Sequence, residues 1–473
     1  MRQDLTEGNP FKQLLLFSLP IFIGNVFQQL YSMADTLIVG HTISSDAMSG
    51  VGCTNSITFL ILGLVWGLTS GFAVRTSQFF GAKDENRLRK SIAVSFELCI
   101  LMTVILTAIA VGLSGPLLRA MNTPQQYYDY AYYYLITIFW GIGATILYNI
   151  AANTLRAVGD SRTPLFCLIF SAILNVVLDF VCIVNFKMTY TGAGFATVVS
   201  QFISGAVCVI YMFKAYPSLR PKKSDWSFNS VMIKGHISVG LPMALQYSIT
   251  ALGCVFQQSA LNGLSSALPG VVTGYTAASK IDNLTMQTMN SLGTASATYA
   301  GQNYGAKKFG RIKDGVFAAM VLAVISWGIS FAFCMGLGNP ITKLFLNGST
   351  GEAALYFNDM VNYSMQFLFY QSIFYLCLGI VFIYRNTLQG IGKSVITTLA
   401  GVTELIARLL TSFILVKHIG YLGVCLSNPI AWIAADIFLL ITYFVTMRKY
   451  VGEQTYTHKA LINFLKHKFK QSV

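Results

Sequence analysis

The strongest constraint on this chain is a series of long apolar stretches, each near the ~20 residues that a helix needs to cross a bilayer. Of the 473 residues, 54% are hydrophobic and only 11% are charged. Soluble proteins carry about 25% charged residues, so lipid must cover most of this surface. We therefore predict an all-α integral membrane protein with twelve transmembrane helices, at residues 11–39, 48–74, 91–116, 127–152, 164–186, 192–215, 235–262, 270–298, 314–338, 355–384, 394–417 and 420–447.

The basic residues predict how these spans are oriented. Of the 32 Lys and Arg, the termini and alternate loops of one side hold 25, Arg385 among them; the other side holds four, and three lie within spans. Because basic residues concentrate on the cytoplasmic side, both termini are expected inside a multi-pass protein of the cell (inner or plasma) membrane. The net charge of +14 then needs no nucleic-acid partner.

Several chemical functions are excluded by the motifs. The nine cysteines lie in apolar runs without a C-x-x-C pair, and the five histidines are scattered, so no metal or cofactor is expected. Gly390-Ile391-Gly392-Lys393-Ser394 approaches a P-loop, but Thr387 stands where that motif needs Gly. No nucleophile and base converge either. An ATP-driven pump is excluded, and the chain is not expected to be an enzyme.

Three short motifs occur twice, which predicts an internal duplication. Ser18-Leu19-Pro20 returns as Gly240-Leu241-Pro242, Ser77-Gln78-Phe79-Phe80-Gly81-Ala82-Lys83 as Gly301-Gln302-Asn303-Tyr304-Gly305-Ala306-Lys307, and Asn153-Thr154-Leu155-Arg156-Ala157-Val158-Gly159 as Asn386-Thr387-Leu388-Gln389-Gly390-Ile391-Gly392. Six spans separate equivalent points, so both halves have the same orientation. Transporters use such parallel repeats around an axis along the membrane normal.

The duplication predicts two six-helix lobes related by a pseudo-two-fold repeat. We place the N-terminal lobe at 1–220, a cytoplasmic linker at 221–234, the C-terminal lobe at 235–450 and a basic cytoplasmic tail at 451–473. The tail has an apolar helical face flanked by lysines, which fits an interfacial helix as well as a disordered segment.

The repeat, the two Gly-Ala-Lys motifs and the stretch Asp35-Thr36-Leu37-Ile38-Val39-Gly40 resemble the multidrug and toxic compound extrusion (MATE) transporters. The resemblance implies a central cavity, alternating access, and a secondary active antiporter that exports drugs and toxins, cationic or amphipathic, against an inward flow of H+ or Na+. A monomer in the lipid bilayer is expected. The alternatives are a lipid-linked oligosaccharide flippase of the same superfamily, which usually has fourteen spans, and a channel.

Acidic side chains inside spans are costly and mark candidate functional sites. By the rise of a helix, Asp35 lies ~6 Å from the outer end of its span, Asp179 ~10 Å and Thr197 ~8 Å, with Asn175 one turn below Asp179. Two carboxylates at one depth suit a shared proton. The same oxygens also suit Na+, with Asp35 and Asp179 as ligands. The alternative is that these side chains only hydrogen-bond helices together.

The family resemblance supports the same group as an ion-coupling site. Asp35, Asn175 and Asp179 match an Asp in span one and an Asn-x-x-x-Asp in span five of the DinF-like and archaeal branch. Thr197 matches a span-six Thr, and Asn153 a span-four Asn near the same pocket. Pro20 and Pro242 lie inside spans one and seven, where a missing backbone donor loosens a helix. The resemblance implies a bend of helix one at Pro20, which MATE models propose to follow protonation.

The second half offers a different polar group. Glu404 and Arg408 are one turn apart, so we expect them to pair, either as a structural salt bridge or as a substrate contact. Another MATE branch carries a Glu in span seven, whereas span seven of this chain has Gln246, Gln257 and Gln258 but no acid. Lys280 and Asp282 do not face each other and each need a partner elsewhere. A possible polar site of the C-terminal lobe comprises Gln246, Lys280, Asp282, Glu404 and Arg408.

Overall fold

The computed structural model describes residues 3–42, 45–121, 123–227, 229–346 and 352–451, and the side chains of residues 32–49, 51, 53, 184, 189, 190, 352, 353 and 451 lie outside this description. The first half contains α1 (Pro10–Thr42), α2 (Ser45–Gly81), α3 (Glu85–Ala120), α4 (Gln125–Trp140), α5 (Ile142–Ala157), α6 (Arg162–Phe180), the π turn η1 (Val181–Asn185) and α7 (Thr189–Ala215). The short 3-10 turns η2 (Pro217–Leu219) and η3 (Lys223–Trp226) follow. The second half contains α8 (Ser230–Gly263), α9 (Val271–Gly305), α10 (Phe309–Leu346), α11 (Glu352–Leu355), α12 (Phe357–Gly390), α13 (Ser394–Leu410), η4 (Thr411–Leu415), α14 (Val416–Ile419) and α15 (Tyr421–Val451).

The predicted all-helical membrane fold is confirmed, and each of the predicted spans coincides with helix. Among the described residues, ten helices are long and apolar enough to cross a membrane. The pair α4 and α5, bent by 49°, adds an eleventh span if it crosses as one. The predicted span 270–298 corresponds to α9, which has 35 residues but many Ser, Thr, Asn and Gln side chains. The mean hydropathy of α9 is lower than that of a lipid-facing helix, as expected for a helix that packs among other helices.

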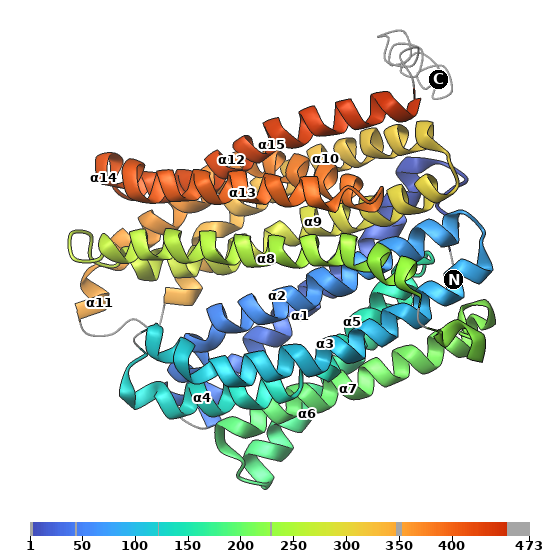
Figure 1. The fold of residues 1–473 in the computed structure, drawn as a ribbon. Coiled ribbons are helices and arrows are strands. Elements are labelled where there is room, and N and C mark those ends of the chain that lie inside the picture. The colour runs from blue at the N-terminus through green and yellow to red at the C-terminus, as the bar shows by residue number, and fades with distance from the viewer. Residues whose placement is uncertain (1–2, 43–44, 122, 228, 347–351, 452–473) are drawn as a thin grey trace.

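The helices run side by side, with α3–α7 on one side of the molecule and α8 and α13–α15 on the other (Figure 1). Helices α2 and α9 pack on each other where the two sides meet, and α1 also packs against α9. Helix α1 begins and α15 ends at the same end of the bundle, where the Tyr450 ring stacks on Phe309. We call this the terminal end of the bundle.

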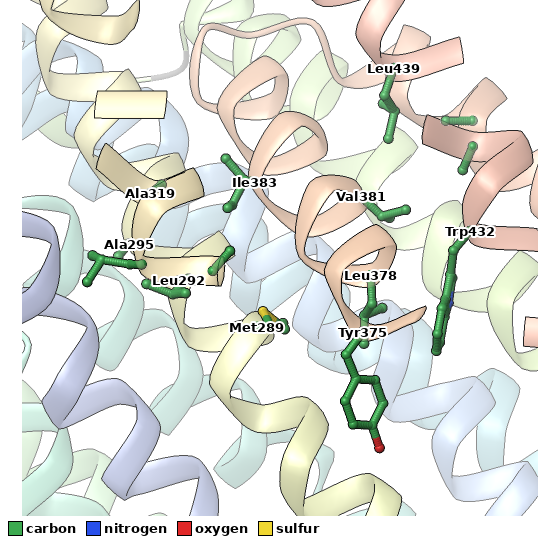
Figure 2. Close-up of a cluster of buried hydrophobic side chains, with 14 of the residues drawn as sticks. Met289, Leu292, Ala295, Ala319, Tyr375, Leu378, Val381, Ile383, Trp432 and Leu439 are labelled. Carbon is green, nitrogen blue, oxygen red and sulfur yellow. The ribbon is translucent and has the colours of Figure 1, made fainter. Parts of the chain in front are cut away.

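A large apolar cluster holds α9, α10, α12 and α15 together. Met289 and Leu292 of α9 and Leu378 of α12 belong to this cluster, and Tyr375 and Trp432 bring α12 against α15 (Figure 2). The Tyr375 and Trp432 ring centroids are 6.4 Å apart. Burying such side chains fixes α12, which carries several of the polar groups described below.

The repeated motifs have the same backbone structure in both halves. Lys83 and Lys307, at equivalent positions after α2 and α9, have φ of 56° and 58°. Gly159 and Gly392, at equivalent positions after α5 and α12, have φ of 90° and 85°. A residue in this left-handed region ends a helix by turning the chain back onto its last carbonyls. The duplicated sequences therefore end their helices in duplicated ways.

The same motifs form the junction between α2 and α9 at the terminal end. Gln78 Nε2 donates to the carbonyl of Gly390 at 2.8 Å, and Gln302 Nε2 donates to the carbonyl of Ala157 at 2.9 Å. Ala157 and Gly390 are equivalent in the repeat, and each is the last residue of its helix. In each half, the glutamine of the repeated motif therefore caps the C-terminal end of a helix in the other half.

The N-terminal segment also spans both halves at this end. Gln3 N donates to Gly159 O at 3.0 Å, on the first half. Leu5 N donates to Gln302 Oε1 and Leu5 O accepts from Asn303 Nδ2, both at 3.0 Å, and Lys308 Nζ donates to Thr6 O at 2.9 Å. Leu5 and Thr6 are buried. The segment thus ties the first half to α9 and α10.

We predict that enlarging either glycine of this junction destabilises the protein. A Cβ at Gly81 would overlap the backbone carbonyl of Gln302, and a Cβ at Gly305 would overlap that of Gln78. Since backbone cannot move aside as a flexible side chain can, Gly81→Ala and Gly305→Ala should each destabilise by about 1–3 kcal/mol, the usual effect of overpacking. The measurement is the thermal unfolding midpoint of the detergent-purified protein.

Gly112→Ala in α3 and Gly336→Ala in α10 are matched controls, since a Cβ at either position meets no atom within 4 Å. They should leave the midpoint unchanged or raise it, because Ala is the better helix former by about 1 kcal/mol. Equal midpoints for all four variants would show that the α2–α9 contact is not tight.

Candidate functional site

A cavity of about 280 Å³ lies between the two sides of the bundle, next to the junction of α2 and α9. The floor of the cavity is the part nearest this junction, and it is lined by Ser77 and Ala157 from the first half and by Thr298 and Gln389 from the second. Its walls come from α2 and α5 on one side and from α8, α9, α12, α13 and α15 on the other. The lining polar and charged side chains are Ser70, Ser77, Asn153, Arg156, Gln246, Thr250, Asn283, Gln287, Asn290, Thr294, Thr298, Arg385, Asn386, Gln389, Glu404 and Arg408.

A buried ion pair joins α12 to α13 at this cavity. Arg385 Nη2 contacts Glu404 Oε1, and both side chains are less than a tenth exposed. The predicted pair with Arg408 is also present, but it is longer, with 3.8 Å from Arg408 Nη2 to Glu404 Oε2. The charge pattern predicts a loop position for Arg385, and this is wrong because α12 continues to Gly390. The sequence therefore missed the nearest partner of Glu404.

Polar side chains from three helices extend this pair. Gln389 Nε2 donates to Gln246 Oε1 at 2.8 Å and lies 3.3 Å from Thr397 Oγ1. With the Gln246 amide turned over, its nitrogen faces Gln389 and its oxygen accepts from Arg385 Nη1 at 3.2 Å instead. Gln246 of α8 thus joins the site as predicted.

The first half contributes Asn153 and Arg156, both from α5. Arg156 Nη1 donates to Asn153 Oδ1 at 3.0 Å, and Asn153 Nδ2 lies 3.3 Å from Thr69 Oγ1 and 3.4 Å from Ser70 Oγ. Asn153 is predicted to lie near the ion-coupling pocket. Its described hydrogen bonds instead lie at the central cavity, because its position on α5 faces α2.

The duplication itself signals these cavity residues. Asn153 and Arg156 of the first motif are equivalent to Asn386 and Gln389 of the second, and all four line the cavity. Arg385 directly precedes the second motif. The repeated sequence therefore faces the cavity from both halves, although the acidic residues of the spans do not mark it.

A second buried polar group lies between α6 and α7. Asn175 Nδ2 lies 3.3 Å from Thr197 Oγ1, and the Asp179 side chain one turn from Asn175 is fully buried. The side chain of Asp35, in α1, lies outside the described residues. The structure thus brings together Asn175 and Thr197, two of the predicted ion-coupling residues, and buries Asp179 on the same helix. None of these three lines the central cavity.

Lys280 and Asp282 do not join the predicted polar site of the second half. Lys280 is exposed on α9. Asp282 accepts from the Tyr375 hydroxyl at 2.5 Å, and that hydroxyl lies 2.8 Å from Thr285 Oγ1. This group links α9 to α12 within the apolar cluster, since Tyr375 packs there (Figure 2). The partner of Asp282 is therefore a tyrosine, which a search for charged partners does not find.

Both predicted helix-loosening prolines lie inside long helices. α1 runs from Pro10 through the buried Pro20 to Thr42. α8 contains Pro242, whose carbonyl accepts from Thr398 Oγ1 at 2.8 Å. A contact of this kind ties α8 to α13 beside the position where the helix lacks a backbone donor.

We predict that removing one member of the Arg385–Glu404 pair is more harmful than removing both. Glu404→Gln leaves the buried Arg408 without a counter-charge among the described residues and leaves Arg385 with only Asp436, whereas Arg385→Met leaves Glu404 with only the long contact to Arg408. Breaking a buried pair typically destabilises by about 3–5 kcal/mol, whereas replacing both members by apolar groups is much milder. The measurement is the thermal unfolding midpoint of each single variant and of Arg385→Met with Glu404→Met.

The double variant should therefore be more stable than the sum of the single effects. The exposed pair Asp84–Arg87, with 3.4 Å between Nε and Oδ2, is the control, since exposed pairs contribute about 0–1 kcal/mol. Additive effects at Arg385 and Glu404 would contradict a direct pair.

Comparison with known proteins agrees with this architecture. The sequence profile of the MatE family matches twice, over residues 20–181 and 242–414, and the two matches begin at Pro20 and Pro242. The probable multidrug resistance protein YpnP of Bacillus subtilis is 30% identical over 82% of this chain and 84% of its own length, and YoeA of the same organism is 25% identical over 93% and 95%. A MATE transporter of the MOP superfamily, solved in an outward-facing conformation, has a TM-score of 0.87 at 21% identity and covers 95% of this chain and 98% of its own. The chain belongs to the MATE family of membrane transporters and, as predicted, is not an enzyme.

Proposed function

We propose that this chain is a secondary active antiporter of the cell membrane that exports small organic compounds, drugs and toxins among them, by alternating access. The observation that carries the proposal is the central cavity between the two halves, which the Gln78 and Gln302 contacts close at the terminal end. The relative YpnP, named a probable multidrug resistance protein, supports the substrate range.

The terminal end faces the cytoplasm in this proposal. Lys83, Lys308 and Arg311 lie there, and basic residues favour the cytoplasmic side. A cavity closed at this end is in the state that releases substrate outward. For the cavity to open inward, the hydrogen bonds of Gln78 and Gln302 must break.

We further propose the lobes 1–220 and 235–450, joined by the linker 221–234. The two separate matches of the family profile, one in each lobe, support this division. The tail 451–473 is proposed as a basic cytoplasmic segment; of it, only Val451 belongs to the described residues.

The coupling ion is proposed to bind in the first lobe, at Asp35, Asn175, Asp179 and Thr197, as in the DinF-like and archaeal branch. The 3.3 Å contact of Asn175 with Thr197 and the burial of Asp179 support one shared site. Protons are favoured over Na+, because two acids suffice for a proton whereas Na+ needs about 5–6 oxygens by analogy with other hard cations.

We predict that Asp179→Asn reduces efflux to background, because it removes the exchangeable proton and keeps the side-chain shape. Asp35→Asn should do nearly the same, and the double variant should be no worse, since groups that act as a unit are non-additive. The measurement is dye movement in proteoliposomes under an imposed pH or sodium gradient.

Asp282→Asn is the matched control, since it changes a buried acid that is bonded to Tyr375 away from the proposed site. It should keep gradient-driven transport. Transport that persists in Asp179→Asn would refute the coupling site. Transport driven by sodium alone at fixed pH would keep the site and change the ion.

We also predict that Pro20→Ala impairs transport while expression and substrate binding stay largely intact. An Ala restores the backbone donor that α1 lacks at this position and so resists a bend during the cycle. Transport assayed beside dye binding in the same preparation separates the two effects, and unchanged transport would leave Pro20 as a packing residue.

A further inference from the structure

We propose that the central cavity selects compounds with an anionic group, such as a carboxylate, sulfonate or phosphate, attached to an apolar or aromatic part. This inference rests on the proposed transport function and replaces the cationic substrates that the sequence suggests. It starts from the charges of the cavity wall. Among the described residues, the lining side chains with a full charge are Arg156, Arg385, Arg408 and Glu404, an excess of two positive charges.

Among the described residues of the wall, the single acid is already paired. Glu404 contacts Arg385 and lies 3.8 Å from Arg408, so it has two cationic neighbours before any ligand enters. Asp436 of α15 is also buried and acts electrostatically on Arg385, but it does not line the cavity. Arg385 is therefore the cation that the protein neutralises most fully.

The other two arginines retain free donors. Arg408 is buried, and its Nη1 has no hydrogen-bond partner among the described residues; its Nε lies 3.3 Å from Asn428 Oδ1. Arg156 Nε is likewise buried without a described partner. A buried donor without an acceptor is unfavourable, and native proteins rarely keep one without a reason. An anionic group at either guanidinium would supply a missing acceptor.

The rest of the wall accepts an apolar body. Phe59, Met243, Tyr247, Met286, Phe382 and Trp432 line the same cavity. Its volume of about 280 Å³ suits a small amphiphile. A cation in this space would meet arginines at low dielectric, and the described part of the lining offers it no free carboxylate, which disfavours it by charge repulsion. The aromatic rings alone therefore do not make this a cation site.

The test uses two dyes that share the xanthene ring system and differ in charge: fluorescein, an anion, and rhodamine 123, a cation. Fluorescence anisotropy with the purified full-length protein gives the affinity for each. We expect fluorescein to bind at least about tenfold more tightly than rhodamine 123. Arg408→Gln and Arg156→Gln should each weaken fluorescein binding by about tenfold or more, as expected for the loss of a hydrogen bond to a charged group.

Arg156 is only partly buried, so Arg156→Gln tests the inference even if Arg408→Gln fails to fold. Lys417→Gln is the matched control, since it removes an exposed cation of α14 outside the cavity and should leave fluorescein binding unchanged. Equal or tighter binding of rhodamine 123, or fluorescein binding that ignores both Arg substitutions, would overturn the anion site.

Transport of both dyes in proteoliposomes separates this inference from the proposed function. Gradient-driven movement of rhodamine 123 alone would support the exporter and overturn the anion preference. Arg-dependent fluorescein binding without gradient-driven movement would support the anion site and contradict the exporter. Gradient-driven movement of fluorescein that is lost in Arg156→Gln would support both.

Discussion

The junction of α2 and α9 is the constraint on which the rest of the structure depends. Gly81 and Gly305 let the two backbones approach so closely that neither position has room for a Cβ. That approach places Gln78 and Gln302 where each caps the last carbonyl of a helix in the opposite half. One bond joins α2 to α12 and the other joins α9 to α5, so a motion that separates the two halves at this end must break both bonds. Closure at this end is therefore a paired event.

The junction also connects closure to the cavity. Ser77 precedes Gln78, Gln389 precedes Gly390, and Ala157 is itself the carbonyl that Gln302 caps; all three line the cavity floor. A substrate that rests on this floor contacts the same helix ends that the glutamine bonds hold together. In alternating access, a ligand shifts the equilibrium only through different contacts in the two states. Here the floor is the part of the site that changes when the junction opens.

The sequence predicted the helices and the duplication well, because long apolar runs and repeated helix ends are local features. The sequence did not predict the side-chain contacts that depend on how distant helices pack. Arg385 lies just beyond the apolar part of its helix, so a charge count places it in a loop, while the structure buries it against Glu404 from another helix. Asp282 and Tyr375 are 93 residues apart, and nothing local pairs an acid with a tyrosine. α9 was predicted as an ordinary span, yet its polarity suits a helix surrounded by protein.

The two halves share a backbone plan but differ in their charged side chains, and this asymmetry bears on how exchange would work. The second half supplies Arg385, Glu404 and Arg408 to the cavity, whereas Asn175, Asp179 and Thr197 are buried in the first half away from its wall. If the coupling ion binds there, it does not compete with substrate for these side chains. Coupling then requires one shared element with two states, such that the ion binds more tightly to one state and the substrate to the other. The helices of the first half that pack on α2 connect the polar group of Asn175, Asp179 and Thr197 to the junction. The movement of α2 against α9 is therefore the step through which ion and substrate would favour different states.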